Sequence, residues 1–230
     1  MDEICPGIYR WTAPHPEWRT RVEWGHEVAS FALVTGDALS LVDPLLPPSG
    51  ASARDDVKRT LDDLVDRSAR LDIMITIPYH TRSAEELYAR YRTRLDTAVW
   101  GHPAVGKRLS DEATPLEQIR PGAPVGRSAV AYAIGKPRRF ETPLYFPAHR
   151  ALAFGDAVIG IDGVLRIWQQ ASTDPEWHER SFVPTLRPLL DLDVERVLVT
   201  HGPSVLQGGR EALEEALSAG PWDYRSAVGA

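Results

Sequence analysis

The chain has little sulfur and no long apolar run, and each shortage excludes a class of protein. Cys5 is the single cysteine among 230 residues, which excludes an internal disulfide and gives no support for a cysteine-ligated metal site. No uninterrupted apolar stretch approaches the roughly 20 residues that span a bilayer. The first residues include Asp2 and Glu3 and no apolar segment, so the sequence indicates no signal peptide.

Basic residues are also outnumbered. The chain has 26 Lys and Arg against 32 Asp and Glu, so the formal net charge is −6. This balance argues against general nucleic-acid binding, and a pair such as Arg138–Arg139 is too short to form a basic patch. We therefore expect a soluble, cytoplasmic protein whose partner is a small-molecule substrate or ligand, and not a nucleic acid or a membrane.

Apolar strands and amphipathic helices alternate along the sequence. No repeat or linker divides the chain, so we expect an α/β fold with a single domain over residues 1–230 and helices outside stacked sheets. Gly36-Asp37 is typical of a hairpin turn. The patterns predict helices at 52–67, 103–109 and 209–218, a loop at 111–127, and strands at 28–35, 38–43, 73–77, 97–100, 129–133, 142–146, 151–154 and 196–200.

One stretch of the first half has the features of a functional loop. The apolar strand Ile73–Ile77 leads into a short polar loop that contains His80, and an amphipathic helix follows. Ser83 and Glu86 have the spacing of a capping box, which predicts that the Ser83 side chain caps this helix. Loops between a strand and a helix often carry chemistry, so His80 is the first candidate.

Three further polar residues come at or just after the ends of apolar strands. Asp43 precedes Pro44, and an Asp in this position commonly organises a turn, so we interpret it as structural. Asp156 follows Phe154-Gly155, and His201 follows the strand that ends at Thr200. The ends of neighbouring strands meet at a sheet edge, so these side chains are able to converge.

The order of these strand ends, from Pro6-Gly7-Ile8-Tyr9 to the last helix, resembles the metallo-β-lactamase-fold superfamily. The resemblance implies a four-layer αββα sandwich of two similar halves, with an active site along one edge of the sheets. It also implies hydrolysis of an ester, lactone, thioester or phosphoester.

The metal-binding motif of that family, His-x-His-x-Asp-His, is only partly present. It matches the segment 78–83, in which His80 is the second histidine. Pro78 replaces the first histidine, Arg82 replaces the aspartate, and Ser83 replaces the last histidine. By the same resemblance, Gly135-Lys136 aligns with the family's next histidine.

Asp156 matches the aspartate that bridges two metals in the family, and His201 matches the last histidine. Two protein ligands per metal fall short of the three that an open zinc site needs. We therefore predict that the dinuclear centre is lost and that no cofactor is bound. Our hypothesis is that Arg82, with Lys136, pairs with Asp156 in place of the metals. If a metal is present, we expect a single zinc or iron ion on His80, Asp156 and His201, because two histidines and one carboxylate suit either metal.

Three functions follow from these residues. The first is a metal-independent hydrolase or lyase on a small anionic or ester-type substrate, in which His80 and His201 act as acid and base. Its other site residues are Arg82, Lys136 and Asp156. The second is a non-catalytic protein that uses the old site as a ligand pocket or a buried salt bridge. The third is a mononuclear metal hydrolase.

Overall fold

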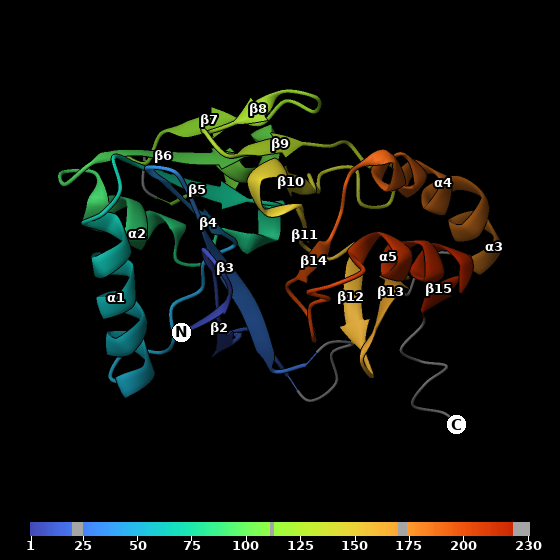
Figure 1. Ribbon diagram of the computed structural model, residues 1–230, viewed down its shortest axis with the longest axis horizontal. Coiled ribbons are helices and arrows are strands. Elements are labelled where there is room, and N and C mark those ends of the chain that lie inside the picture. Colours follow the sequence, from blue (N-terminus) through green and yellow to red (C-terminus); the bar gives the residue numbers. More distant parts are fainter. Residues whose placement is uncertain (20–24, 111–112, 170–173, 223–230) are drawn as a thin grey trace.

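The strands of the computed structural model form three sheets, and its longer helices lie on the outside (Figure 1). The structure describes residues 1–19, 25–110, 113–169 and 174–222. Within those ranges, no helix is both long and apolar enough to cross a bilayer.

The first sheet has seven strands, which lie side by side in chain order. Neighbours are antiparallel up to β4 and parallel from β4 onward, where helices α1 (Ser52–Val65) and α2 (Ala84–Tyr91) make crossovers. The predicted hairpin at Gly36-Asp37 is confirmed. The strands are β1 (Asp2–Cys5), β2 (Ile8–Pro14), β3 (Glu27–Thr35), β4 (Ala38–Val42), β5 (Arg70–Ile75), β6 (Asp96–Gly101) and β7 (Leu116–Gln118).

The second sheet has the strand order β14-β11-β10-β9-β8, and a small third sheet has the order β12-β13-β15. The strands of the second sheet are β8 (Pro124–Val125), β9 (Ala129–Ala131), β10 (Leu144–Phe146), β11 (Ala151–Phe154) and β14 (Arg196–Val199). Those of the third are β12 (Val158–Ile161), β13 (Val164–Trp168) and β15 (Pro221–Trp222). The helices of this half are α3 (Pro175–Trp177), α4 (Val183–Leu186) and α5 (Gly209–Ser218).

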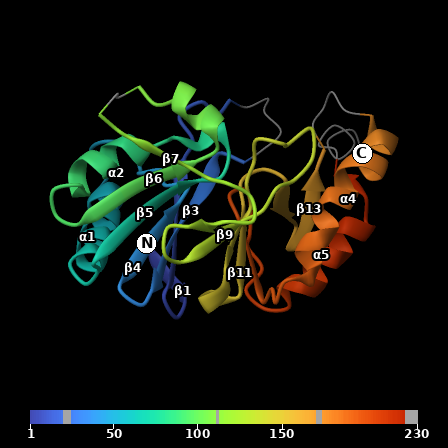
Figure 2. The same ribbon diagram turned by 90° about the horizontal axis from the view of Figure 1, so that it is seen from above.

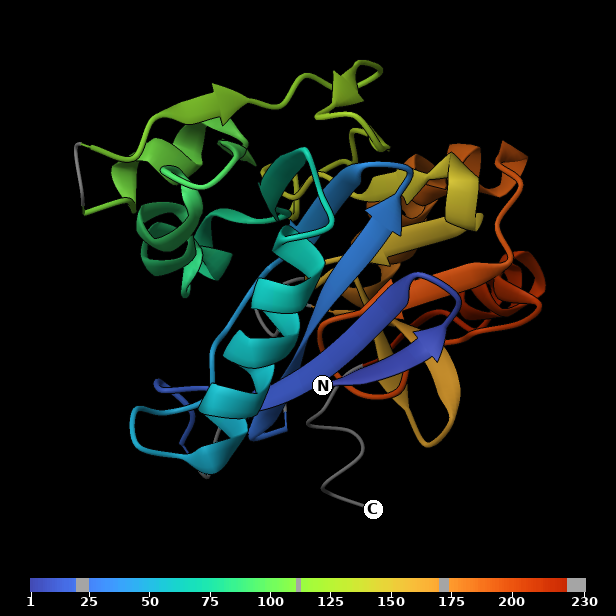
Figure 3. The ribbon, with the colours of Figure 1, turned by 60° about the vertical axis from the view of Figure 1, so that its left-hand side comes forward.

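Three clusters of buried side chains join four layers. One cluster packs α1 and α2 on the outer face of the first sheet, through residues such as Leu61 and Leu87, and Figure 3 shows α1 along this face. A second cluster lies between the two large sheets, with Phe31 and Phe146. A third joins the second sheet to α4 and α5, and Figure 2 shows these helices on the side opposite α1 and α2. The predicted αββα arrangement of helices outside stacked sheets is therefore confirmed.

Alternation along β11 shows how the sequence specifies these layers. Ala151 and Ala153 belong to the cluster between the sheets, whereas Leu152 and Phe154 belong to the cluster beneath the helices. Successive side chains of a strand point to opposite faces. Small residues on the inner face and large ones on the outer face thus let one strand pack in two cores.

Some predicted elements differ from the structure. The predicted loop at 111–127 contains β7 and β8, whose few residues give no periodic pattern, and residues 111–112 lie outside the described ranges. The predicted helix at 103–109 is a 3₁₀ turn over Pro103–Lys107. The helical segment after Asp174 contains a π-helical turn over His178–Phe182, just before Pro184. Proline removes a backbone donor, so a regular α-helix cannot continue unchanged through this position.

Candidate functional site

Two pairs of parallel strands deliver polar residues to one edge of the sheets. In the first sheet β4 and β5 are parallel, with Val42 opposite Met74, so Asp43 and the turn Pro78–His80 follow on the same side. In the second sheet β11 and β14 are parallel, with Phe154 opposite Val199. Asp156 and His201 each come two residues after that last pair, and this common offset brings them together.

The side chain of Asp43 orients the imidazole ring of His80. One carboxylate oxygen, Oδ1, accepts a hydrogen bond from the Thr76 backbone N–H at 2.8 Å. The other, Oδ2, accepts from the Thr76 hydroxyl at 2.5 Å and from Nδ1 of His80 at 2.9 Å. Asp43 is 1% exposed, so this carboxylate has no solvent to replace its three donors. Our interpretation of Asp43 as a turn residue alone is incomplete, because its side chain fixes the ring of His80.

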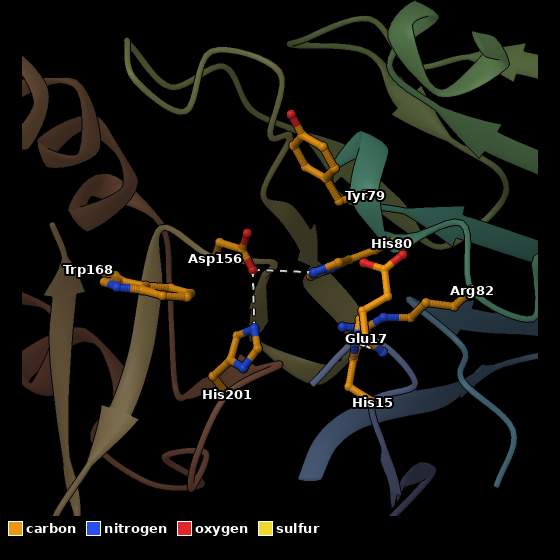
Figure 4. A pocket seen from close by; sticks show the side chains of 8 residues that line it. All are labelled: His15, Glu17, Tyr79, His80, Arg82, Asp156, Trp168 and His201. Carbon is orange, nitrogen blue, oxygen red and sulfur yellow. Dashed lines mark hydrogen bonds and ion pairs between the residues drawn. The ribbon is translucent and has the colours of Figure 1, made fainter. Parts of the chain in front are cut away.

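His80 and His201 both face the same oxygen of Asp156. Nε2 of each ring lies 3.3 Å from Oδ1 of Asp156, and both histidines are buried. Figure 4 shows the two rings approaching this carboxylate from opposite halves of the fold. The structure therefore brings three of the five predicted site residues into contact, and a fourth, Arg82, lines the same cavity.

Burial and neighbouring charges set the protonation of these groups in different directions. Burial and the charge of Arg82 lower the pKa of His80, but the carboxylates of Asp43 and Asp156 outweigh them and the net pKa is raised. Burial dominates at His201, whose pKa is lowered. Burial favours the neutral form of Asp156, yet His80, His201 and Arg138 hold the pKa of its carboxyl well below the usual range.

The cation that pairs with Asp156 is Arg138, and our hypothesis that Arg82 and Lys136 do so is wrong. Nη1 of Arg138 lies 3.1 Å from Oδ2 of Asp156, and the Arg138 guanidinium stacks over the ring of Trp168 at 5.0 Å. Lys136 is exposed. The loop that leads to β10 therefore presents a cation to the site two residues later than the alignment placed it.

Arg82 lies in the site but bonds to backbone. Its Nη1 donates to the carbonyl oxygen of Asp43 at 2.9 Å and, more weakly, to that of Ala29 at 3.4 Å. Burial lowers the pKa of Arg82 more than Asp43 and Asp156 raise it. Both Asp43 and Arg82 have positive φ, +46° and +43°, a region that non-glycine residues rarely adopt.

Ser83 has another role than the one predicted. It precedes α2, but its side chain makes no capping hydrogen bond. Its hydroxyl instead accepts from the backbone N–H of Leu46 at 2.9 Å, and so ties the loop after β4 to the start of α2. The capping-box spacing was therefore met without the capping contact.

Glu141 supports the loop that carries Asp156. Its carboxylate accepts from the backbone N–H of Gly155 at 3.0 Å and of Ala157 at 2.9 Å, on either side of Asp156. Glu141 is 1% exposed. Burial and the nearby charge of Asp156 raise its pKa to about 7.

A small cavity of about 180 Å³ opens above these groups. Tyr79 stands at its edge, 64% exposed and stacked against Arg108 at 4.5 Å. Trp168 forms a wall, with its ring edge-on to His201 at 5.4 Å. The full lining, drawn in Figure 4, is His15, Glu17, Tyr79, His80, Arg82, Asp156, Trp168 and His201.

Several of these contributors were missed from sequence. In the sequence, Arg138 stands out only as one of two adjacent arginines, and Glu141, His15 and Glu17 lie in loops without periodic patterns. Trp168 gave a weak signal as the large aromatic residue that ends an apolar strand.

The donor set fits one metal ion better than two. The ligand atoms of His80, Asp156 and His201 lie within 4.8 Å of one another. Two imidazoles and one carboxylate suit zinc or iron, and three protein ligands leave a position for water or substrate. Asp43 supplies the outer carboxylate that orients a metal-binding histidine.

Comparison with known proteins supports the fold. No protein-family model matches the sequence, and no curated protein matches it either. Among solved structures, a metallo-β-lactamase from Erythrobacter litoralis is 15% identical and has a TM-score of 0.63, with 94% of this chain and 93% of that chain covered. A metallo-β-lactamase from Pontibacter korlensis is 14% identical with a TM-score of 0.61 and covers 94% and 96%.

A metallo-β-lactamase family protein from Thermus thermophilus is 16% identical, with a TM-score of 0.59 and coverage of 94% and 80%. At these identities the likeness concerns architecture, and it extends over nearly the whole chain. The three sheets and the outer helices agree with that architecture. The chain has the metallo-β-lactamase fold.

Proposed function

We propose that this chain is a hydrolase of small ester-type substrates that uses one metal ion held by His80, Asp156 and His201. The observation that carries the proposal is the approach of two Nε2 atoms to one carboxylate oxygen, each at 3.3 Å. Zinc in such a site lowers the pKa of bound water and polarises a carbonyl or phosphoryl oxygen.

The hydrogen bonds around His80 support this proposal. Because the Asp43 carboxylate accepts from Nδ1, the Nε2 atom of a neutral His80 carries a lone pair. A lone pair that faces the carboxylate of Asp156 is repelled unless a cation lies between them. That cation is either a proton on His80 or a metal ion, and the second imidazole aimed at the same oxygen favours the metal.

The residues around the ligands act on their orientation. Asp43 holds the proton on Nδ1 of His80, while Arg138 and Glu141 fix the side chain and the backbone of Asp156. Trp168 packs edge-on against the ring of His201 and limits its movement. Preorganised ligands of this kind do not have to be reoriented when substrate arrives.

A metal-free acid–base site is the second candidate, and the ion pair between Arg138 and Asp156 favours it. Arg82 and Arg138 together balance the two carboxylates of Asp43 and Asp156 without a metal. His80 would then be protonated and would act as a general acid near neutral pH.

The deciding experiment is elemental analysis of protein purified without chelators, combined with a panel of esters, lactones, thioesters and phosphoesters. One-metal hydrolysis predicts about one zinc or iron per chain, activity that chelation removes, and recovery on adding the metal back. His80→Ala and His201→Ala should each lose the metal, and Lys136→Ala, at an exposed position, should retain it.

Hydrolysis that persists in metal-free protein would replace the first candidate by the second. Two metals per chain would contradict both. Stoichiometric metal without hydrolysis of any compound in the panel would overturn the proposed reaction class.

A further inference from the structure

Arg82 is held in place by one of its three nitrogens. Nη1 bonds to two backbone carbonyls, as described above. Nε and Nη2 are buried and have no hydrogen-bond partner among the residues that the structure describes. Backbone carbonyls are neutral, so these contacts fix the position of the guanidinium and leave its charge without a directly bonded counter-charge.

The nearby carboxylates are already occupied by other donors. The oxygens of Asp43 bond to Thr76 and His80. Those of Asp156 face His80, His201 and Arg138. Neither carboxylate is hydrogen-bonded to Arg82, although both are close enough to influence it electrostatically.

The two nitrogens without partners form a particular edge of the guanidinium. The N–H bonds of Nε and Nη2 are parallel, and this edge binds carboxylate or phosphate through two hydrogen bonds at once. Buried charged donors that lack an acceptor are unfavourable, so a ligand oxyanion placed against this edge would remove a penalty that the protein alone carries.

Arg82 also lines the cavity that contains His80, Asp156 and His201 (Figure 4). The cavity, about 180 Å³, is smaller than the roughly 300–1,000 Å³ that encloses a drug-sized ligand. It therefore suits a small molecule. An anionic group held by Arg82 would lie on the side of the cavity opposite Trp168, with the rest of the molecule against the two histidines.

We propose that the Nε–Nη2 edge of Arg82 binds an oxyanion, either a carboxylate or a phosphate, carried by the small substrate of this site. The position of the reacting bond against His80, Asp156 and His201 rests on the proposed function. Oxyanion binding by Arg82 does not depend on it, because neither the metal nor turnover is needed.

Glu17 provides a second, independent test of anion binding in this cavity. Its carboxylate lines the same cavity and is exposed, so it repels a bound anion weakly through solvent. Its removal should strengthen anion binding without touching Arg82. His15, beside it, accepts the Glu17 backbone N–H at Nδ1. A neutral His15 therefore carries its proton on Nε2.

The test is calorimetric titration of metal-stripped protein with inorganic phosphate, acetate and succinate at low ionic strength. We expect one site for at least one of these anions. Arg82→Gln should weaken the affinity for the anion by about tenfold or more. Arg82→Lys should weaken it nearly as much, because lysine lacks two parallel N–H donors. Glu17→Gln should tighten it by about two- to threefold. The preference between phosphate and the carboxylates identifies the oxyanion.

Arg108→Gln is the matched control, since Arg108 is exposed and stacked on Tyr79 at the edge of the cavity. The affinity of this variant for the anion should stay within about twofold of that of wild type. Circular dichroism checks that each variant is folded. If Arg82→Gln does not fold, tighter binding by Glu17→Gln still supports the site, and unchanged binding overturns it.

Three results would overturn the proposal: no binding of any of the three anions, equal affinity in wild type and folded Arg82→Gln, or an equal loss in Arg108→Gln. These outcomes leave metal content and hydrolysis unaffected. Conversely, anion binding that depends on Arg82 in a protein without metal or hydrolysis supports this inference while the proposed function fails.

Discussion

The carboxylate of Asp43 accepts a hydrogen bond from Nδ1 of His80 at 2.9 Å, and Nε2 of the same ring lies 3.3 Å from Asp156. The imidazole therefore connects a carboxylate of the first half of the fold to one of the second. Asp43 in the first half sets the tautomer of His80. Nε2 of the ring, with either a lone pair or a proton, faces Asp156 in the second half.

Asp43→Asn should weaken metal binding by about 10- to 100-fold, because outer carboxylates orient metal-binding histidines. The Thr76 backbone N–H fixes the amide oxygen on one side, so the new NH₂ group faces His80 and favours the wrong tautomer. Competition with a chromogenic chelator measures the affinity. Asp37→Asn, at an exposed turn position, should have no effect, and an unchanged affinity in Asp43→Asn would rule out this role.

Arg138→Gln separates the two candidate functions. It removes the arginine that pairs with Asp156, and breaking a pair that is mostly shielded from solvent costs about 3 kcal/mol of unfolding free energy. With a one-metal site, added zinc or iron should restore this stability and bind at least as tightly as in wild type, since a nearby positive charge has gone. Without a metal site, added metal should restore nothing.

Thermal unfolding with and without metal gives the comparison for Arg138→Gln. Arg139→Gln is its matched control, because Arg139 is the exposed neighbour that stacks on Phe140 at 4.7 Å. A variant as stable as wild type would show that the ion pair contributes little.

Glu141→Ala should lower the unfolding free energy by about 2–4 kcal/mol, because it leaves two buried N–H groups beside Asp156 without acceptors. Glu141→Gln retains one carbonyl acceptor and should lose about half as much. Chemical denaturation measures both. Equal stability of the two variants would contradict a role for the acceptor oxygens.

His178 predicts a pH dependence away from the metal-ligand candidates. It is fully buried, neither ring nitrogen has a hydrogen-bond partner within the described ranges, and its ring lies edge-on to Phe182 at 4.8 Å. Burial, with a smaller contribution from Arg138, lowers its pKa from 6.5 to about 4. Between pH 6.5 and pH 4, His178 therefore binds a proton in the unfolded state but not in the folded state.

Stability should accordingly fall as pH falls from 6.5 to 4, by up to about 3 kcal/mol from this residue. His178→Leu has no such proton to bind, so its unfolding free energy should change less over that range and should exceed that of wild type at pH 4. Urea unfolding at several pH values measures this. Parallel pH profiles in both proteins would show that His178 does not titrate as its burial implies.

Most of the fold was predictable because several strands and helices each show a clear hydrophobic pattern or a typical turn sequence. The hairpin at Gly36-Asp37 and the apolar strand before His201 follow from local turn chemistry and hydrophobic pattern. The short strands β7 and β8 have three and two residues, too few to show a period. Tertiary pairing across the sheets, not local pattern, makes them strands.

The site was predictable where residues follow regular strands and unpredictable where they come from loops. Asp156 and His201 have fixed offsets from paired strands, and His80 follows a strand by one short turn. Which cation reaches Asp156 depends instead on the path of the loop before β10 and on side-chain length. The sequence alone therefore does not distinguish Arg138 from Lys136 as the partner of Asp156.

Ser83 illustrates a different limit. The spacing to Glu86 is that of a capping box, yet the hydroxyl accepts from Leu46, 37 residues earlier in the chain. A serine at a helix start has several backbone N–H groups within reach, and local sequence identifies only those nearby.

The parallel register of β11 and β14 ties occupancy of the site to assembly of the protein. Asp156 and His201 meet only if Phe154 is paired with Val199, and His80 joins them only if the two large sheets are stacked. A ligand that contacts His80, Asp156 and His201 would link the two halves of the fold and stabilise their association. At a concentration 100 times its dissociation constant it would add about 2.7 kcal/mol to the free energy of unfolding, so protease resistance would report whether the site is filled.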